Sequence, residues 1–140
     1  MHRLNRHYVP ALIWTALIHL FASDLLSSSH TGGLVQMLAR LILGHPLADL
    51  PLELTQFTLR KLAHLTAYGI LGWLWFRAMR GEQRGWTLRW SLLAVAISLF
   101  VAVTDELHQS FVPSRTASPL DVLIDFCGAV IAQLIIARRR

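Results

Sequence analysis

Long apolar runs, each with ionisable side chains close to one end, constrain this fold more than any other feature of the sequence. Residues 62–76 and 90–104 are fifteen-residue runs without a formal charge, and a third run from Pro119 carries Asp121 and Asp125. Hydrophobic residues make up 54% of the chain and charged residues only 15%, against about 25% in an average globular domain. So little polar surface predicts a membrane protein.

The predicted spans must draw in some ionisable groups to cross a bilayer. Fifteen residues rise about 22 Å as a helix, whereas the hydrocarbon core is about 30 Å thick. The 140 residues have room for one domain. We therefore predict a single all-α domain, residues 1–140, built as an integral membrane bundle of four transmembrane helices. The spans are expected at about residues 8–24, 61–77, 90–107 and 119–137.

The segment between the first two spans predicts one further helix. Residues 34–43 are apolar except for Gln36 and Arg40, which lie four positions apart on one helical face. About ten residues are too few to cross the hydrocarbon core. We expect an interfacial or re-entrant amphipathic helix here.

Basic residues are distributed unevenly between the expected loops. The amino-terminal segment, the loop after the second span and the carboxy-terminal tail hold nine of the thirteen. With four spans these segments share one side of the membrane, which the positive-inside rule makes cytoplasmic. We predict that both termini are cytoplasmic. The first span is expected to be a retained anchor, because no good small-residue cleavage site follows it.

Polar residues of three spans then converge near the opposite, extracytoplasmic face. Helical spacing puts them in one stripe on each span, and a charged side chain facing lipid would be costly. We predict that the stripes share one polar pocket. They consist of Lys61, His64 and Tyr68 on the second span, Asp105, His108 and Gln109 on the third, and Asp121 and Asp125 on the fourth, with Glu106 and Arg115 nearby.

Two interpretations of this pocket stay open. It can be an ion-pair network that only fixes helix packing, with Lys61 and Arg115 neutralising the carboxylates. It can also bind a polar head group, with Arg115 and Lys61 holding a phosphate or carboxylate. Intramembrane ionisable residues commonly have a function. The ligand-binding candidates are Lys61, Tyr68, Asp105, Gln109, Arg115, Asp121 and Asp125.

Catalysis is a sharper hypothesis about the same residues. His64 or His108 beside a carboxylate such as Glu106 can act as a general acid or base. No His-Glu-x-x-His spacing, cysteine pair, phosphate-binding glycine loop or Gly-x-Ser-x-Gly elbow is present. We therefore expect neither a metal nor a cofactor. The net charge of +5 fits arginines facing anionic lipid, and the apolar content argues against nucleic acid as a partner.

Three motifs cover residues 60–132. They are Lys61-x-x-His64-x-x-x-Tyr68-x-x-Leu71-Gly72, then Thr104-Asp-Glu-Leu-His-Gln-x-Phe-Val-Pro-x-Arg115-Thr, then Asp121-Val-Leu-x-x-x-x-Gly128-Ala129. Together they resemble the VanZ-like family of bacterial membrane proteins, named for a protein associated with resistance to teicoplanin. The chain departs from the family pattern at Arg60, Ser114 and Asp125, where the family often has Asp, Gly and Asn.

The resemblance implies a small protein of the bacterial inner membrane that acts where cell-envelope precursors are exposed. Our first hypothesis is a protein that binds or modifies an anionic, amphiphilic envelope molecule, linked in the family to glycopeptide resistance. One alternative is an intramembrane hydrolase or transferase acting on a lipid-linked phosphate. Another is a structural or assembly subunit whose polar residues only hold helices together. The expected partner is a membrane lipid or lipid-linked envelope precursor, and the glycine-bearing helix faces are compatible with a homodimer.

Overall fold

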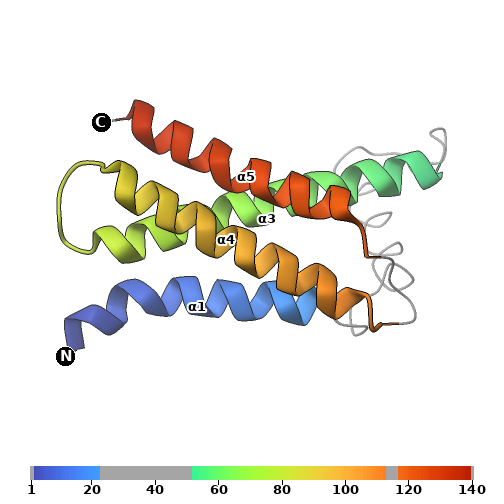
Figure 1. Ribbon diagram of the computed structural model, residues 1–140, viewed down its shortest axis with the longest axis horizontal. Helices are drawn as coiled ribbons and strands as arrows, with labels where there is room; N and C mark the ends of the chain where they lie inside the picture. The colour runs from blue at the N-terminus through green and yellow to red at the C-terminus, as the bar shows by residue number, and fades with distance from the viewer. Residues whose placement is uncertain (1, 23–51, 113–116, 140) are drawn as a thin grey trace, which may run out of the picture.

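The computed structural model describes residues 2–22, 52–112 and 117–139, which form helices and no strand (Figure 1). The all-α prediction is therefore confirmed for the described part of the chain. The interfacial helix predicted within residues 34–43 lies outside it. The helices are α1 (His2–Ala22), α3 (Leu52–Arg80), α4 (Leu88–Gln109) and α5 (Pro119–Arg138).

Helix α3 is the centre of the bundle. It packs against α1, α4 and α5, and its contact with α5 is the most extensive in the described structure. Both termini and the α3–α4 loop lie at one end of the bundle, which we call the termini end (Figure 1). The start of α3, the end of α4 and the start of α5 lie at the other end, which we call the connection end.

Short signals in the sequence set the helix ends. Helix α3 ends before Gly81, which has φ 58° and donates its N–H to the carbonyl of Arg77 at 3.0 Å, as in a glycine-terminated helix. The hydroxyl of Thr87 accepts the N–H of Trp90 and caps α4. Pro119 opens α5, where its missing N–H costs nothing.

Helix α4 shows how the bundle divides its side chains. Its buried residues are Ser91, Ala94, Ser98, Val101, Ala102, Asp105, Glu106 and Gln109. Its exposed side chains include Leu88, Leu92, Leu93, Phe100, Val103 and Leu107. Small and polar groups thus face the other helices while large apolar groups face outwards, the reverse of a water-soluble helix. This arrangement suits a bilayer.

By length and composition, α4 and α5 are the helices of the described structure that could cross a membrane. Helix α3 is less apolar because its central part contains a histidine, a tyrosine and two glycines. Helix α1 carries several histidines and arginines. Two apolar helices support a membrane protein, and four spans stay a prediction.

Helices α3 and α5 approach closely where their side chains are smallest. A Cβ added to Gly128 would overlap the carbonyl oxygen of Leu65, and a Cβ on Gly72 would lie 3.2 Å from the Cα of Ala129. Gln133 of α5 donates its side-chain amide to the carbonyl of Gly72 at 3.0 Å. These contacts set the distance and register between α3 and α5, and so position the polar residues one or two turns away.

Candidate functional site

Polar side chains of three helices form one cluster towards the connection end. On the α3–α5 seam, Lys61 donates to a carboxylate oxygen of Asp121, and Nδ1 of His64 lies 3.0 Å from Oδ1 of Asp125. Residues three apart on α3 and four apart on α5 share a helical face, so the two pairs follow one another along the seam. The predicted meeting of these two stripes is confirmed.

Helix α4 joins the cluster through an amide and an arginine. Gln109 donates its side-chain N–H to Oδ2 of Asp105 at 3.1 Å and accepts Nη2 of Arg60 at 3.3 Å. The same Nη2 lies 3.7 Å from Oδ2 of Asp121. A continuous chain of polar contacts therefore runs from Asp105 on α4, across Arg60 on α3, to Asp121 on α5. We call this set the polar cluster: Arg60, Lys61, His64, Asp105, Gln109, Asp121 and Asp125.

Glu106 fixes the connection between α4 and α5. Its Oε2 accepts the backbone N–H of Ser118 at 2.6 Å. Ser118 is the N-cap residue of α5, and its own side chain makes no capping hydrogen bond. A glutamate that binds the N-cap N–H performs half of a capping box, and its charge suits the positive end of the helix dipole. Glu106 thus anchors the start of the helix that carries Asp121 and Asp125.

Charge is layered across the polar cluster. The carboxylates of Asp121 and Asp125 are 2% and 0% exposed, whereas the side chains of Lys61 and Arg60 are 16% and 34% exposed. The cations therefore form an outer layer over buried carboxylates. Long basic side chains can keep their apolar stems packed and their heads towards solvent. An approaching molecule would meet positive charge first.

Four buried oxygens at the inner side of the polar cluster lack a hydrogen-bond partner among the described residues. They are the hydroxyl of Tyr68, Oδ1 of Asp105, Oε1 of Glu106 and Oδ2 of Asp125. Buried polar atoms in proteins are nearly always paired. These acceptors make the interior suitable for hydrogen-bond donors, and Tyr68 lies one turn beyond His64 on the same face of α3.

The structure separates His108 from the other predicted residues of α4. Asp105 and Gln109 are buried, whereas His108 is exposed. Arg115 lies outside the described residues. The catalytic assignments of His64, His108 and Glu106 stay predictions, and geometry favours His64 because it alone of the two histidines contacts a carboxylate of the cluster.

Two residues that the predicted stripes left out take part in contacts between helices. Arg60 precedes Lys61 by about 100° around the helix, so periodicity excludes it from the stripe, but its long side chain reaches Gln109. The signal in the sequence that could have identified Arg60 is its departure from the family pattern, which often has Asp at this position. Nε2 of His19 lies 3.4 Å from the hydroxyl of Thr104, so this contact links α1 to α4.

Metal-ligating side chains do not gather in the described residues. No group of three His, Cys, Asp or Glu side chains there is placed to hold a metal ion. The cluster instead consists of paired acids and bases with a few unsatisfied acceptors. Its geometry suits the binding of a charged group or the transfer of a proton.

Comparison with known proteins places the chain in a family. No curated protein and no solved structure matches it. The sequence pattern of the VanZ/LLP1 family matches residues 8–139, which is nearly the whole chain. Together with the two apolar helices, this match indicates a membrane protein. The chain belongs to the VanZ/LLP1 family.

Proposed function

We propose that this protein binds the anionic head group of an amphiphilic cell-envelope molecule at its connection end. The layering of charge carries the proposal. Lys61 and Arg60 are partly exposed above the buried carboxylates of Asp121 and Asp125. A phosphate or carboxylate can bind such cations through charge-assisted hydrogen bonds, while the inner carboxylates hold the cations in place. Membership of the VanZ/LLP1 family supports a role in the cell envelope.

The proposal includes a membrane arrangement of four spans with both termini in the cytoplasm. Both termini and the α3–α4 loop share one end of the bundle. Within or close beside that loop in the sequence lie Arg77, Arg80, Arg84 and Arg89. The positive-inside rule therefore makes that end cytoplasmic. The 29 residues of α3 rise about 43 Å, more than a hydrocarbon core of about 30 Å. Its first turns then project beyond the membrane, where Phe57 lies 4.9 Å from Nζ of Lys61.

Arg115 is proposed as a further cation for the same ligand. It belongs to the short segment that joins α4 to α5, and the Glu106–Ser118 hydrogen bond ties the flanks of that segment together. The described part of the cluster holds four carboxylic acids, counting Glu106, and two long basic side chains, Lys61 and Arg60. A third cation would reduce the excess of negative charge and strengthen anion binding.

A second candidate function rests on the contact between His64 and Asp125. A carboxylate 3.0 Å from Nδ1 orients the imidazole and leaves Nε2 to exchange a proton, as in other His–carboxylate pairs. His64 would then take a proton from a water or hydroxyl whose oxygen forms a bond to the phosphorus of a lipid-linked phosphate. The bond from phosphorus to the leaving oxygen breaks, and His64 returns the proton to that oxygen. This makes the protein an intramembrane hydrolase or transferase. The alternative of a purely structural cluster predicts neither binding nor turnover.

Native mass spectrometry of the protein extracted with its own lipids tests head-group binding. We expect wild type to retain an anionic lipid that Lys61→Gln and Arg115→Ala do not retain, so each variant should carry fewer anionic lipids than wild type. Arg84→Gln is the control, because Arg84 is exposed in the opposite loop. A thermal melt of each variant checks folding. Equal lipid retention in wild type and both site variants would contradict the proposal.

The enzyme alternative needs a separate readout. With undecaprenyl phosphate or a related lipid-linked phosphate as substrate, His64→Gln should retain lipid binding and lose turnover. His108→Gln should retain both, because His108 is exposed. Loss of binding and turnover together in His64→Gln would argue for a packing role instead.

Thiol labelling tests the proposed orientation. Cys127 is free and exposed, so the background variant is Cys127→Ser. In that background we expect Ser114→Cys to react with a membrane-impermeant thiol reagent added outside the cell, and Gln83→Cys to react only after lysis. The reverse pattern would invert the topology.

A further inference from the structure

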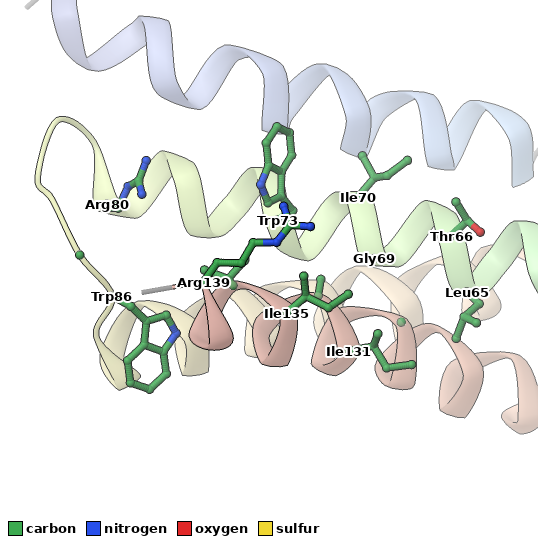
Figure 2. Close-up of a pocket in the computed structure, with 14 residues that line it drawn as sticks. Leu65, Thr66, Gly69, Ile70, Trp73, Arg80, Trp86, Ile131, Ile135 and Arg139 are labelled. Atoms are coloured by element: carbon green, nitrogen blue, oxygen red, sulfur yellow. The ribbon is translucent and has the colours of Figure 1, made fainter.

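A long groove follows the seam between α3 and α5 towards the termini end (Figure 2). Its volume is about 840 Å³, within the range of small-molecule sites. The walls are apolar and come from both helices. They include Leu65, Ile70, Trp73, Ile131, Ala132 and Ile135.

Glycines make the floor of this seam groove. Gly69 and Gly128 both line it, and the backbones of the two helices approach each other there because neither residue has a side chain. Apolar walls over a low floor form a channel along the helices. Nothing in the polar cluster takes part in it.

Basic and aromatic residues mark the termini end of the seam groove. Arg80, Arg139 and Trp86 line it there, and its lining contains no acidic side chain. Figure 2 shows Arg139 extending from the end of α5 back over the groove towards Trp73. Nε of Arg80 is buried without a hydrogen-bond partner in the described structure. An apolar channel that ends at two arginines suits an amphiphile with a negative head.

We propose that the seam groove binds an anionic phospholipid of the surrounding membrane. Its phosphate lies at Arg139, with Arg80 as a second contact, and one acyl chain lies along the glycine floor. The stretch of α3 from Leu65 to Arg80 rises about 22 Å, and one leaflet of the hydrocarbon core is about 15 Å thick. A chain that starts at the arginines therefore fits within the length of the groove.

A second copy of the chain is a less suitable occupant. Two copies in one membrane have the same orientation, so the arginine end of one groove would meet the arginine end of the other. Like charges brought together across an interface cost free energy, whereas a phosphate neutralises them. The site lies at the opposite end of the bundle from the polar cluster and does not depend on the function proposed for it.

The first experiment tests whether the groove selects a negatively charged head group. Phosphatidylglycerol is titrated into delipidated protein in detergent, and bound lipid is counted by native mass spectrometry. Phosphatidylcholine with the same acyl chains is the comparison lipid. Wild type should bind phosphatidylglycerol more tightly than phosphatidylcholine. Loss of one charge-assisted contact in Arg139→Gln should weaken phosphatidylglycerol binding about fivefold. Arg138→Gln removes the same charge from the neighbouring exposed residue, which does not line the groove, and should change binding less than about twofold.

A steric pair of variants tests the channel. Ile135 and Leu134 are neighbours and are 48% and 57% exposed, but only Ile135 lines the groove. Ile135→Trp should exclude both lipids, and Leu134→Trp should exclude neither. Equal behaviour of the two tryptophan variants, or of the two arginine variants, would overturn the proposal.

Two further outcomes would also overturn it. If Ile135→Trp changes only the ratio of monomer to dimer, the groove is an interface between copies. If Lys61→Gln abolishes the phosphatidylglycerol binding, the lipid occupies the polar cluster instead. Unchanged binding in Lys61→Gln supports the groove and leaves the head-group site to be judged separately.

Discussion

At the connection end of the bundle, charged side chains lie between helices, whereas at the termini end most of them lie on the outside. The carboxylates of Asp121 and Asp125 are almost fully buried and each contacts a basic side chain. Arginines at the other end instead lie over aromatic rings, with Arg77 at 4.7 Å from the ring of Trp73. Several more, including Arg84 of the α3–α4 loop, are exposed.

This difference separates two uses of charge in a membrane protein. A buried pair has already lost its water, so removing one partner leaves an expensive unpaired group. An exposed arginine keeps its hydration and contributes little to the free energy of unfolding. Charges at the termini end can therefore set orientation or meet a lipid phosphate with little effect on stability, while those at the connection end can form a site and also hold the helices together. Substitutions at the two ends should differ in size accordingly.

The largest effect is expected from Asp121→Asn. The change removes the charge that faces both Lys61 and Arg60, and breaking a buried pair costs about 3–5 kcal/mol. We expect about 3 kcal/mol here, because both cations are partly exposed. Unfolding in detergent measures it, with Arg84→Gln as the exposed control at about 0.5 kcal/mol or less. Equal losses would remove the distinction between the two ends.

A glycine series tests whether the polar cluster depends on the α3–α5 approach. Gly128→Ala should lower the free energy of unfolding by about 2 kcal/mol, because the new methyl group meets the backbone of α3. Gly72→Ala should cost less, since its nearest contact would be 3.2 Å, and Gly69→Ala least, since its nearest would be 3.4 Å. Thermal melts of the three variants give the order. A reversed order would mean that another contact sets the helix distance.

Removing the Glu106 cap should have an intermediate effect. Glu106→Ala leaves the N–H of Ser118 without its acceptor, which costs about 1 kcal/mol. Glu106→Gln keeps an acceptor oxygen and should cost less. Comparison of the thermal melts of the two variants separates the contribution of the hydrogen bond from that of the charge. If Glu106→Gln lowers the free energy of unfolding as much as Glu106→Ala does, the negative charge at the start of α5 provides the stabilisation.

The smallest effect is expected at the termini end. Arg77→Gln removes the guanidinium from the face of Trp73, and an exposed cation–π contact contributes about 0.5–1 kcal/mol. We expect a loss of about 0.5 kcal/mol with no change in lipid retention at the polar cluster. A loss as large as that of Asp121→Asn would show that the exposed end is also essential for stability.

Much of this architecture follows from local patterns. The predicted span at residues 119–137 corresponds to α5 because Pro119 opens that helix, and the span at 90–107 to α4 because Thr87 caps it. Helical spacing and loop charge predict that the polar stripes of α3 and α5 lie at the same end of the bundle, but they do not predict which side chains pair. Which neighbour faces each residue depends on how each helix is rotated in the bundle, and no local pattern contains that rotation. His108 therefore proved exposed, and Arg60 proved to be a link between α4 and α5.

The position of α5 after α3 and α4 in the chain has a consequence for the order of assembly. Translation delivers α3 and α4 before α5, so Lys61 and His64 enter the bundle before Asp121 and Asp125 exist to receive them. The glycine contact between α3 and α5 then brings all four residues together in one event. The polar cluster therefore forms only after α5 has been made, and a chain truncated before Pro119 would leave Lys61 and His64 without their carboxylate partners.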